Sequence, residues 1–282
     1  MSKEKGKKKT GKVLLIIGII LLIVIFLISA LFWSPKRYSI TTPYYGKGTE
    51  SDMANVKNAL GDSDTEGRFR LYFQWYNVVH ELGHGLLMYN DGTPLNIVDE
   101  EQLVNDFAVA YWKYYGETDK VNELKDIANY AVIHVGNNYA NGVDYYENAK
   151  KHTIQGLAFA NDFFNFNDYG WFQFSSVKHS FDENKDLETV LKEMGFNDIK
   201  LNERKTLVYD KIDEDTSDKI INDAVNNFRD WGLIMPDVIH HFDNDPNNSF
   251  SLPSIKYLGL FELADFITRV GRTTKNSMSL LS

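Results

Sequence analysis

The chain is organised around one stretch, Val78-Val79-His80-Glu81-Leu82-Gly83-His84-Gly85-Leu86, which reads His-Glu-x-x-His inside an apolar run. We expect residues 69–89 to be helical, so that His80 and His84 lie one turn apart and project from the same face. Two imidazoles at this spacing can bind one metal ion, and Glu81 can contact a water on that ion. The stretch therefore predicts a zinc site in which Glu81 is the general base for the water.

A helix that merely happens to carry two histidines is the alternative. Two features of the stretch disfavour it. The residues around the histidines are uncharged, as a buried metal-bearing helix requires. In addition, Gly83 and Gly85 each cost about 1 kcal/mol of helix propensity relative to alanine, which indicates a packing or access requirement.

A third ligand is predicted on the following helix, which we expect over residues 99–115. Glu101 and Asn105 lie on one face of it. Glu101 follows His84 by 17 positions, enough for a turn and an antiparallel return. It would complete a set of two histidines and one glutamate and leave the fourth position for water. Glu100 would point about 100° away, and its negative charge in the first turn favours the helix dipole.

The N-terminal region carries the second strong signal. Residues 13–33 are 21 uncharged residues, long enough to cross a bilayer of about 30 Å as a helix. Residues 1–12 hold six lysines and one glutamate, which predicts a cytoplasmic N-terminus and an external remainder. A cleaved signal peptide is the alternative, although its apolar region usually runs only about 7–15 residues. We therefore predict a single-pass cell-membrane protein that contacts the lipid bilayer through residues 13–33.

The composition excludes some partners. Outside residues 1–33 the chain has 24 basic and 38 acidic residues, a net charge of −14. So acidic a domain argues against nucleic acid and anionic lipid headgroups as partners. The chain has no cysteine, so core burial, metal binding or both must stabilise it.

The hydrophobic periodicity predicts a mainly α fold, with α+β as the alternative. The expected organisation is a basic cytoplasmic tail (1–12), a transmembrane helix (13–33), a stalk or linker (34–65) and a zincin-like catalytic domain (66–282). Further helices are predicted over residues 53–60, 121–135, 154–164, 187–194, 220–231 and 252–270. Residues 163–174 are expected to be irregular or a hairpin, and the stretch that begins at residue 200 includes the best strand candidate, Thr206–Asp210.

The class of zinc site follows from what surrounds the motif. A metzincin would need glycine three residues and histidine six residues after His84, where this chain has Leu87 and Asn90. That class is excluded. An intramembrane protease would carry the motif within an apolar span, whereas here it lies 47 residues beyond the predicted transmembrane segment, between charged flanks. A gluzincin, whose third ligand is a glutamate on a following helix, remains.

Several of these residues together resemble a little-characterised family of bacterial gluzincin metallopeptidases: His80-Glu81-Leu82-Gly83-His84, Pro94 and Glu100-Glu101-Gln102-Leu103-Val104-Asn105-Asp106-Phe107-Ala108. The Glu-x-x-x-Asn-x-Phe-Ala part is also similar to the ImmA-like metallopeptidases, and the resemblance covers residues 75–112. It implies that His80, His84 and Glu101 bind zinc and that Glu81 is catalytic. Asn105 replaces the usual aspartate, so it could accept a hydrogen bond from a ligand imidazole but would bring no charge.

Peptide hydrolysis also needs a donor that stabilises the oxyanion besides the zinc ion. We prefer His179, because His179-Ser180-Phe181-Asp182 resembles a His-Ser-x-Asp segment of the first family. His240 and His241 are alternatives, followed by His134, His152 or a tyrosine. For each of these histidines taken singly, an ordinary surface or capping role is the more common alternative.

The sequence thus predicts a membrane-anchored zinc peptidase that cleaves peptide or protein substrates outside the cell. One alternative is an anchored binding or regulatory protein with a structural or inactive zinc site. The intact Glu81 argues against it, because a purely structural site has no use for a general base. Another alternative is a zinc hydrolase of a non-peptide amide or ester. The oligomeric state leaves no signal in the sequence.

Overall fold

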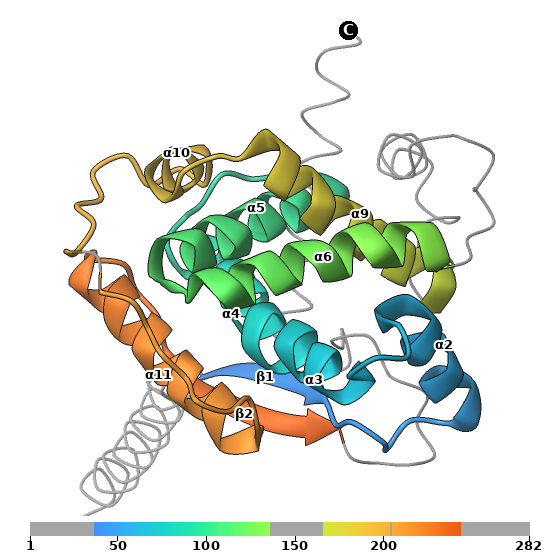
Figure 1. The fold of residues 1–282 in the computed structure, drawn as a ribbon. Coiled ribbons are helices and arrows are strands. Elements are labelled where there is room, and N and C mark those ends of the chain that lie inside the picture. Colours follow the sequence, from blue (N-terminus) through green and yellow to red (C-terminus); the bar gives the residue numbers. More distant parts are fainter. Residues whose placement is uncertain (1–36, 136–165, 204, 244–282) are drawn as a thin grey trace, which may run out of the picture. The chain divides into compact units, whose positions relative to one another are not determined.

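The computed structural model describes residues 37–135, 166–203 and 205–243, and this part of the chain is mainly helical, as predicted (Figure 1). From Tyr38 onward the described residues belong to one compact unit. In chain order the elements are β1 (Arg37–Pro43), α2 (Glu50–Leu60), α3 (Thr65–Phe69), the π-helix η1 (Arg70–Tyr76), α4 (Asn77–Tyr89), α5 (Ile97–Tyr115), α6 (Thr118–His134), α9 (Phe166–Glu183), α10 (Leu187–Glu193), α11 (Glu214–Asp230) and β2 (Asp237–Asp243).

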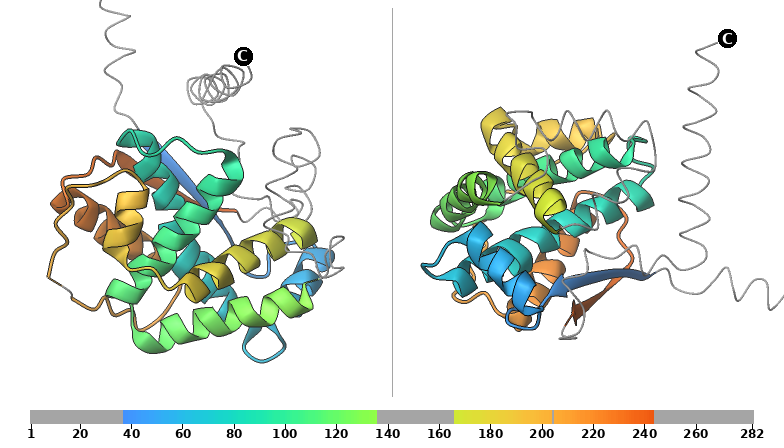
Figure 2. Two further views of the ribbon diagram at one scale, coloured as in Figure 1. Left: turned by 90° about the horizontal axis from the view of Figure 1, so that it is seen from above. Right: turned by 90° about the vertical axis from the view of Figure 1, so that its right-hand side faces the viewer.

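Helix α5 lies at the centre of this unit. Every residue from Glu101 to Trp112 is buried, and α4, α9 and α10 all pack against the helix (Figures 1 and 2). A helix covered on all sides normally carries apolar residues all round. Because α5 nevertheless carries several polar side chains, each of them needs a hydrogen-bond partner from a neighbouring helix.

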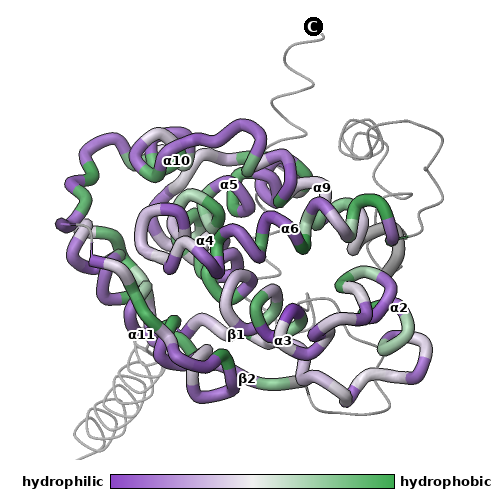
Figure 3. The backbone as a smooth tube through the Cα atoms, viewed as in Figure 1, coloured by the Kyte–Doolittle hydropathy of each residue, from purple (hydrophilic) through white to green (hydrophobic). Residues whose placement is uncertain are grey.

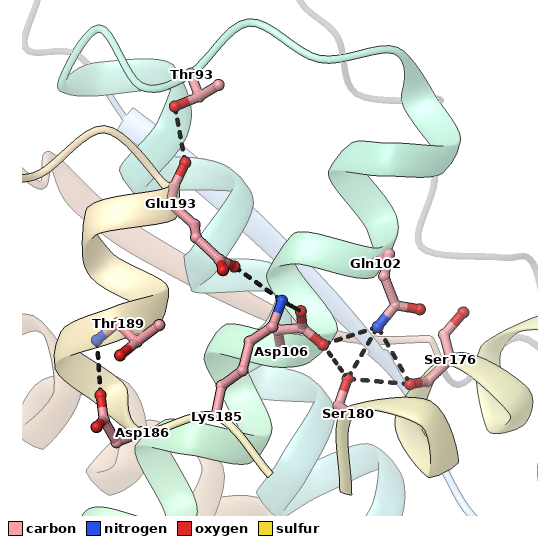
Figure 4. Close-up of polar contacts among 9 residues, drawn as sticks. All are labelled: Thr93, Gln102, Asp106, Ser176, Ser180, Lys185, Asp186, Thr189 and Glu193. Carbon is pink, nitrogen blue, oxygen red and sulfur yellow. Dashed lines mark hydrogen bonds and ion pairs between the residues drawn. The ribbon is translucent and has the colours of Figure 1, made fainter. Parts of the chain in front are cut away.

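One such group joins α5 to α9 and α10, and Figure 4 shows it around Asp106. Gln102 Nε2 and Ser180 Oγ donate hydrogen bonds to Asp106 Oδ1 at 2.8 and 2.5 Å. Lys185 Nζ lies 3.0 Å from Asp106 Oδ2 and 2.9 Å from Glu193 Oε2. The buried carboxylate is thus paired and hydrogen-bonded, and it ties the C-terminal half of α9 to α5.

The outer helices bury one face each. In Figure 3 hydrophobic and hydrophilic residues alternate along α6 and α11, and both helices were predicted from this periodicity. In α11 the buried side chains include Ile220, Ala224 and Phe228. The chain leaves α11 through Gly232, whose φ of 82° is a conformation that glycine adopts at little cost.

The two glycines of the central motif have separate packing roles. A Cβ on Gly83 would lie 3.1 Å from Phe107 Cδ1 and 3.2 Å from Val104 Cβ, so Gly83 allows α4 to approach α5 closely. A Cβ on Gly85 would instead lie 2.5 Å from Met235 Cε and 3.2 Å from Tyr38 Cε1. The glycines therefore let α4 fit between α5 and the segments that carry Tyr38 and Met235.

This packing predicts different outcomes for two matched substitutions. Gly83→Ala should lower the free energy of unfolding by about 1–2 kcal/mol, because Val104 Cβ is fixed to the backbone of α5 and overpacking outweighs the gain in helix propensity. Gly85→Ala should be nearly neutral, because the flexible end of Met235 can move. Denaturant unfolding of both variants measures the difference. Equal stability of the two variants would contradict the packing account.

Two local predictions are wrong. Residues 166–174, expected to be irregular or a hairpin, form the first half of α9. The aromatic residues are poor helix formers. Because Trp171, Phe172 and Phe174 are buried in the core, tertiary packing outweighs their low helix propensity and the segment is helical. Residues Thr206–Asp210 do not form a strand. The N–H of Leu207 donates a backbone hydrogen bond to the carbonyl of Tyr115 at 2.7 Å, but within the part of the chain that the structure describes no second strand pairs with these residues.

The region predicted as a stalk also differs. Strand β1 pairs with β2 in a two-stranded sheet, and α2 contributes Val56 and Leu60 to the core. In β1 the side chains of Tyr38, Ile40 and Thr42 alternate inward, a period-two pattern that the sequence analysis did not use. The packed domain therefore begins near Tyr38 and not at residue 66.

The predicted membrane localisation has to be corrected. Among residues 37–135, 166–203 and 205–243, no helix combines the length and apolar character needed to cross a bilayer. The predicted span 13–33 and the predicted helices 154–164 and 252–270 lie outside the described residues.

Candidate metal centre

Helices α4 and α5 bring three potential ligands together, as predicted. His80 and His84 lie on α4, and Glu101 lies on α5. Ligand atoms of the three residues all lie within 4.8 Å of one another. His80 Nε2 is 3.3 Å from Glu101 Oε2, and His84 Nε2 is 3.6 Å from Glu101 Oε1.

These separations suit a shared metal ion. Two atoms that each lie about 2.0–2.1 Å from one ion at the tetrahedral angle are about 3.3–3.4 Å apart. His80 and Glu101 are 2% and 8% exposed, whereas the side chain of His84 is 20% exposed. The group is therefore buried on the side of His80 and accessible from the side of His84. Two imidazole nitrogens and a carboxylate could hold a metal ion, and this donor set fits zinc.

Glu100 has a role that the sequence analysis missed. Its Oε1 lies 2.9 Å from His84 Nδ1, the nitrogen on the opposite side of the ring from the Nε2 that faces Glu101. A carboxylate in this place fixes the orientation of a ligand imidazole and raises its basicity. The sequence places Glu100 about 100° around the helix from Glu101, where its charge favours the helix dipole. In the structure both neighbouring glutamates nevertheless contact His84.

Asn105 also differs from expectation, because it supports the glutamate and not an imidazole. Its Nδ2 donates to Gln173 Oε1 at 2.9 Å, and Gln173 Nε2 donates to Glu101 Oε2 at 2.7 Å. Its Oδ1 accepts a hydrogen bond from Tyr76 Oη at 2.6 Å. Gln173 comes from α9, the helix that the sequence analysis did not predict, so no local pattern pointed to it.

The charges of His84 and Glu101 each shift the pKa of the other residue. Burial lowers the pKa of His84, but the negative charges of Glu101 and Glu100 and the hydrogen bond to Glu100 outweigh it and raise the pKa to about 10. Burial raises the pKa of Glu101, but the charges of His84 and His80 and the hydrogen bonds from His80 and Gln173 lower the pKa to about 2. In the metal-free protein a protonated His84 therefore balances an ionised Glu101 at neutral pH.

A pH dependence of metal binding follows. A metal ion binds the neutral imidazole, whereas His84 stays protonated below a pKa of about 10. Metal binding must then release about one proton from His84, and the apparent affinity should rise by up to about tenfold per pH unit between about pH 6.5 and 8.5. Competition with a chelator of known affinity measures this slope. An affinity independent of pH would contradict the assignment of His84 as a ligand.

Glu81 directly follows the candidate ligand His80 on α4 and is half-buried. Burial raises its pKa, and the charges of His80 and His84 partly offset that rise. Asn77 Nδ2 donates a hydrogen bond to Glu81 Oε1 at 3.3 Å. A carboxylate that is partly accessible and has a raised pKa suits the transfer of a proton near neutral pH.

The structure does not bring His179 to this group. Its side chain is exposed on α9, and six helical positions from Gln173 turn it about 120° away from the residue that contacts Glu101. The predicted oxyanion role of His179 therefore has no support from the geometry.

The other described histidines have different surroundings. His240 Nε2 lies 2.8 Å from Thr42 Oγ1, and His240 Nδ1 lies 2.9 Å from Asp218 Oδ1, so both ring nitrogens are engaged between β1 and α11. His241 is exposed. His134 is also exposed and lies 2.7 Å from the carbonyl oxygen of Tyr130 through its Nδ1. His152 lies outside the described residues.

Comparisons with models of protein families, with curated proteins and with solved structures found no match, so the resemblance to gluzincin metallopeptidases stays a prediction.

Proposed function

We propose that this protein is a zinc-dependent hydrolase that cleaves peptide bonds. The observation that carries the proposal is the position of Glu81. Glu81 follows His80 on α4, and its half-buried carboxylate is close enough to the His-His-Glu group to feel the charges of all three members. The group is accessible on the side of His84. A site that only stabilises the fold needs four protein ligands and no neighbouring base. Three ligands with an adjacent carboxylate support a hydrolytic site.

The chemistry divides between the metal ion and the protein. When bound, zinc would polarise the substrate carbonyl and make a water acidic at neutral pH. Glu81 takes a proton from the water while the water oxygen forms a bond to the carbonyl carbon. When the C–N bond breaks, Glu81 passes this proton to the leaving nitrogen. Asn77 holds one carboxylate oxygen of Glu81 through the 3.3 Å hydrogen bond.

The backbone near the base is also held in place. Tyr38 Oη on β1 donates a hydrogen bond to the carbonyl oxygen of Glu81 at 2.7 Å. Strand β1 thus fixes α4 at the position of the base, and this contact limits movement of Glu81 relative to the ligands. We further propose that the chain is related to the gluzincin metallopeptidases that it resembles, with a zincin-like arrangement of α4 and α5.

Removal and return of the metal ion test the function. Protein dialysed against a chelator should lose hydrolysis of casein and of unstructured peptides, and addition of zinc should restore it. Parallel assays with simple esters and non-peptide amides identify the substrate class. Peptide hydrolysis that persists without metal, or zinc-dependent hydrolysis of the non-peptide compounds alone, would contradict the proposal.

A further inference from the structure

Four buried side chains form a hydrogen-bonded row that ends at the proposed ligand Glu101. Tyr76 belongs to η1, Asn105 and Glu101 to α5, and Gln173 to α9. The row runs from Tyr76 Oη to Asn105 Oδ1 (2.6 Å), from Asn105 Nδ2 to Gln173 Oε1 (2.9 Å) and from Gln173 Nε2 to Glu101 Oε2 (2.7 Å). None of the four residues is more than 9% exposed. We call these residues the Glu101 row.

The direction of the hydrogen bonds in the row is fixed from its carboxylate end. An ionised carboxylate can only accept hydrogen bonds, so Gln173 must turn its amide nitrogen toward Glu101. The oxygen of Gln173 then faces Asn105, which must donate from its own nitrogen. The oxygen of Asn105 in turn faces Tyr76, whose hydroxyl donates. A reversal at any member would place two acceptors or two donors against each other in a buried site.

From this geometry we infer that Gln173 is a positioning residue for the metal ligand Glu101, and that Asn105 fixes which end of Gln173 faces that ligand. The inference rests on the proposed function, because it assumes that Glu101 binds the metal ion. The Gln173 hydrogen bond holds Glu101 Oε2 at 3.3 Å from His80 Nε2. The carboxylate is thus oriented before a metal ion arrives, as partners of metal ligands commonly ensure.

The row also explains why residue 105 is an asparagine and not an aspartate. An aspartate there could not donate to Gln173 Oε1. Gln173 would then turn its nitrogen toward residue 105 and present its oxygen to Glu101. Asn105 is therefore suited to a glutamine partner, whereas a carboxylate at this position suits a direct contact with an imidazole.

A purely structural role of Gln173 in joining α9 to α5 is the competing explanation. The chain offers a matched control, because Ser180 also joins these helices through its 2.5 Å hydrogen bond to Asp106 (Figure 4). Ser180 is 3% exposed and makes no hydrogen bond to the metal ligands among the described residues. Loss of packing alone should therefore affect Ser180→Ala and a Gln173 variant alike.

The test is a double-mutant cycle of zinc affinity. Gln173→Met keeps the length of the side chain and removes the donor, and Asn105→Leu keeps the branched shape and the number of heavy atoms and removes the amide. Affinity is measured on full-length protein by competition with a chromophoric chelator, and the melting temperature of each metal-free variant is recorded. Tyr76→Phe, which removes one hydroxyl, replaces Asn105→Leu in the cycle if that variant does not fold.

We expect Gln173→Met to bind zinc about 10–100-fold more weakly than wild type. Asn105→Leu should also weaken binding, and the double variant should bind no more weakly than Gln173→Met, because Asn105 acts through Gln173. Ser180→Ala should lower the melting temperature and leave the zinc affinity unchanged. Wild-type affinity in Gln173→Met, or independent losses that multiply in the double variant, would overturn the inference. Wild-type protein that binds no zinc would instead refute the proposed function.

Discussion

Glu81→Gln should retain the metal ion and the fold but lose peptide hydrolysis by at least about 10²–10⁴-fold, the usual contribution of a general base. Glutamine keeps the size of the side chain and cannot accept the proton from water. Neither metal ligation nor core packing depends on Glu81, since it is half-buried beside the ligand group and not part of it. Metal content, melting temperature and turnover are measured on the same preparation.

Asn77→Ala is the companion variant. It removes the 3.3 Å hydrogen bond to Glu81 Oε1 and leaves the carboxylate in place. It should reduce turnover much less than Glu81→Gln does, because the base remains and only its orientation is freer. Full activity of Glu81→Gln would show that the hydrolytic mechanism is wrong, however tightly the metal ion binds.

Glu101→Gln should lose the metal ion, and through it some stability, because metal binding is coupled to folding. Its carboxylate is the only acidic member of the proposed ligand group. Glu100→Gln should keep the metal ion but bind it about 10–100-fold more weakly, because Glu100 supports the ring of His84 from 2.9 Å. Chelator competition and thermal unfolding with and without zinc separate the two variants.

If Glu100→Gln bound zinc more weakly than Glu101→Gln, the roles of ligand and of supporting residue would have to be exchanged between Glu101 and Glu100. If Glu100→Gln sheds the metal ion and Glu101→Gln keeps it, the ligand is Glu100. Equal zinc affinity of Glu100→Gln and wild type would show that Glu100 does not support the ring of His84. Its role would then be limited to the helix dipole.

The candidate metal-binding group was predictable because its sequence pattern is local. His80 and His84 are one helical turn apart whatever surrounds the helix. Glu101 needed only the further assumption that the next helix returns antiparallel, and the contacts of Tyr76 with Asn105 and of His80 with Glu101 agree with this arrangement. Gly83 was recognised as costly in a helix, and its close approach to α5 accounts for that cost.

The supporting residues were not predictable from local patterns. Gln173 reaches the site only because the aromatic residues of α9 are buried in the core, and single-sequence propensity gives that helix little weight. Glu100 contacts His84 because α4 approaches α5 closely enough for both glutamates to reach it, which a calculation of helical angles alone does not reveal. Strand β1 showed an alternating pattern, but its partner β2 is nearly 200 residues away, so the pairing had no signal in sequence spacing.

The metal content of the wild-type chain tests the central claim most directly. Protein purified without chelator and analysed for its elements should contain about one zinc ion per chain. The variant His84→Ala, which lacks one of the three proposed ligands, should contain little zinc when it is purified and analysed in the same way. Wild-type protein without a stoichiometric metal ion, or equal metal in both proteins, would contradict the assignment of His80, His84 and Glu101 as a metal centre.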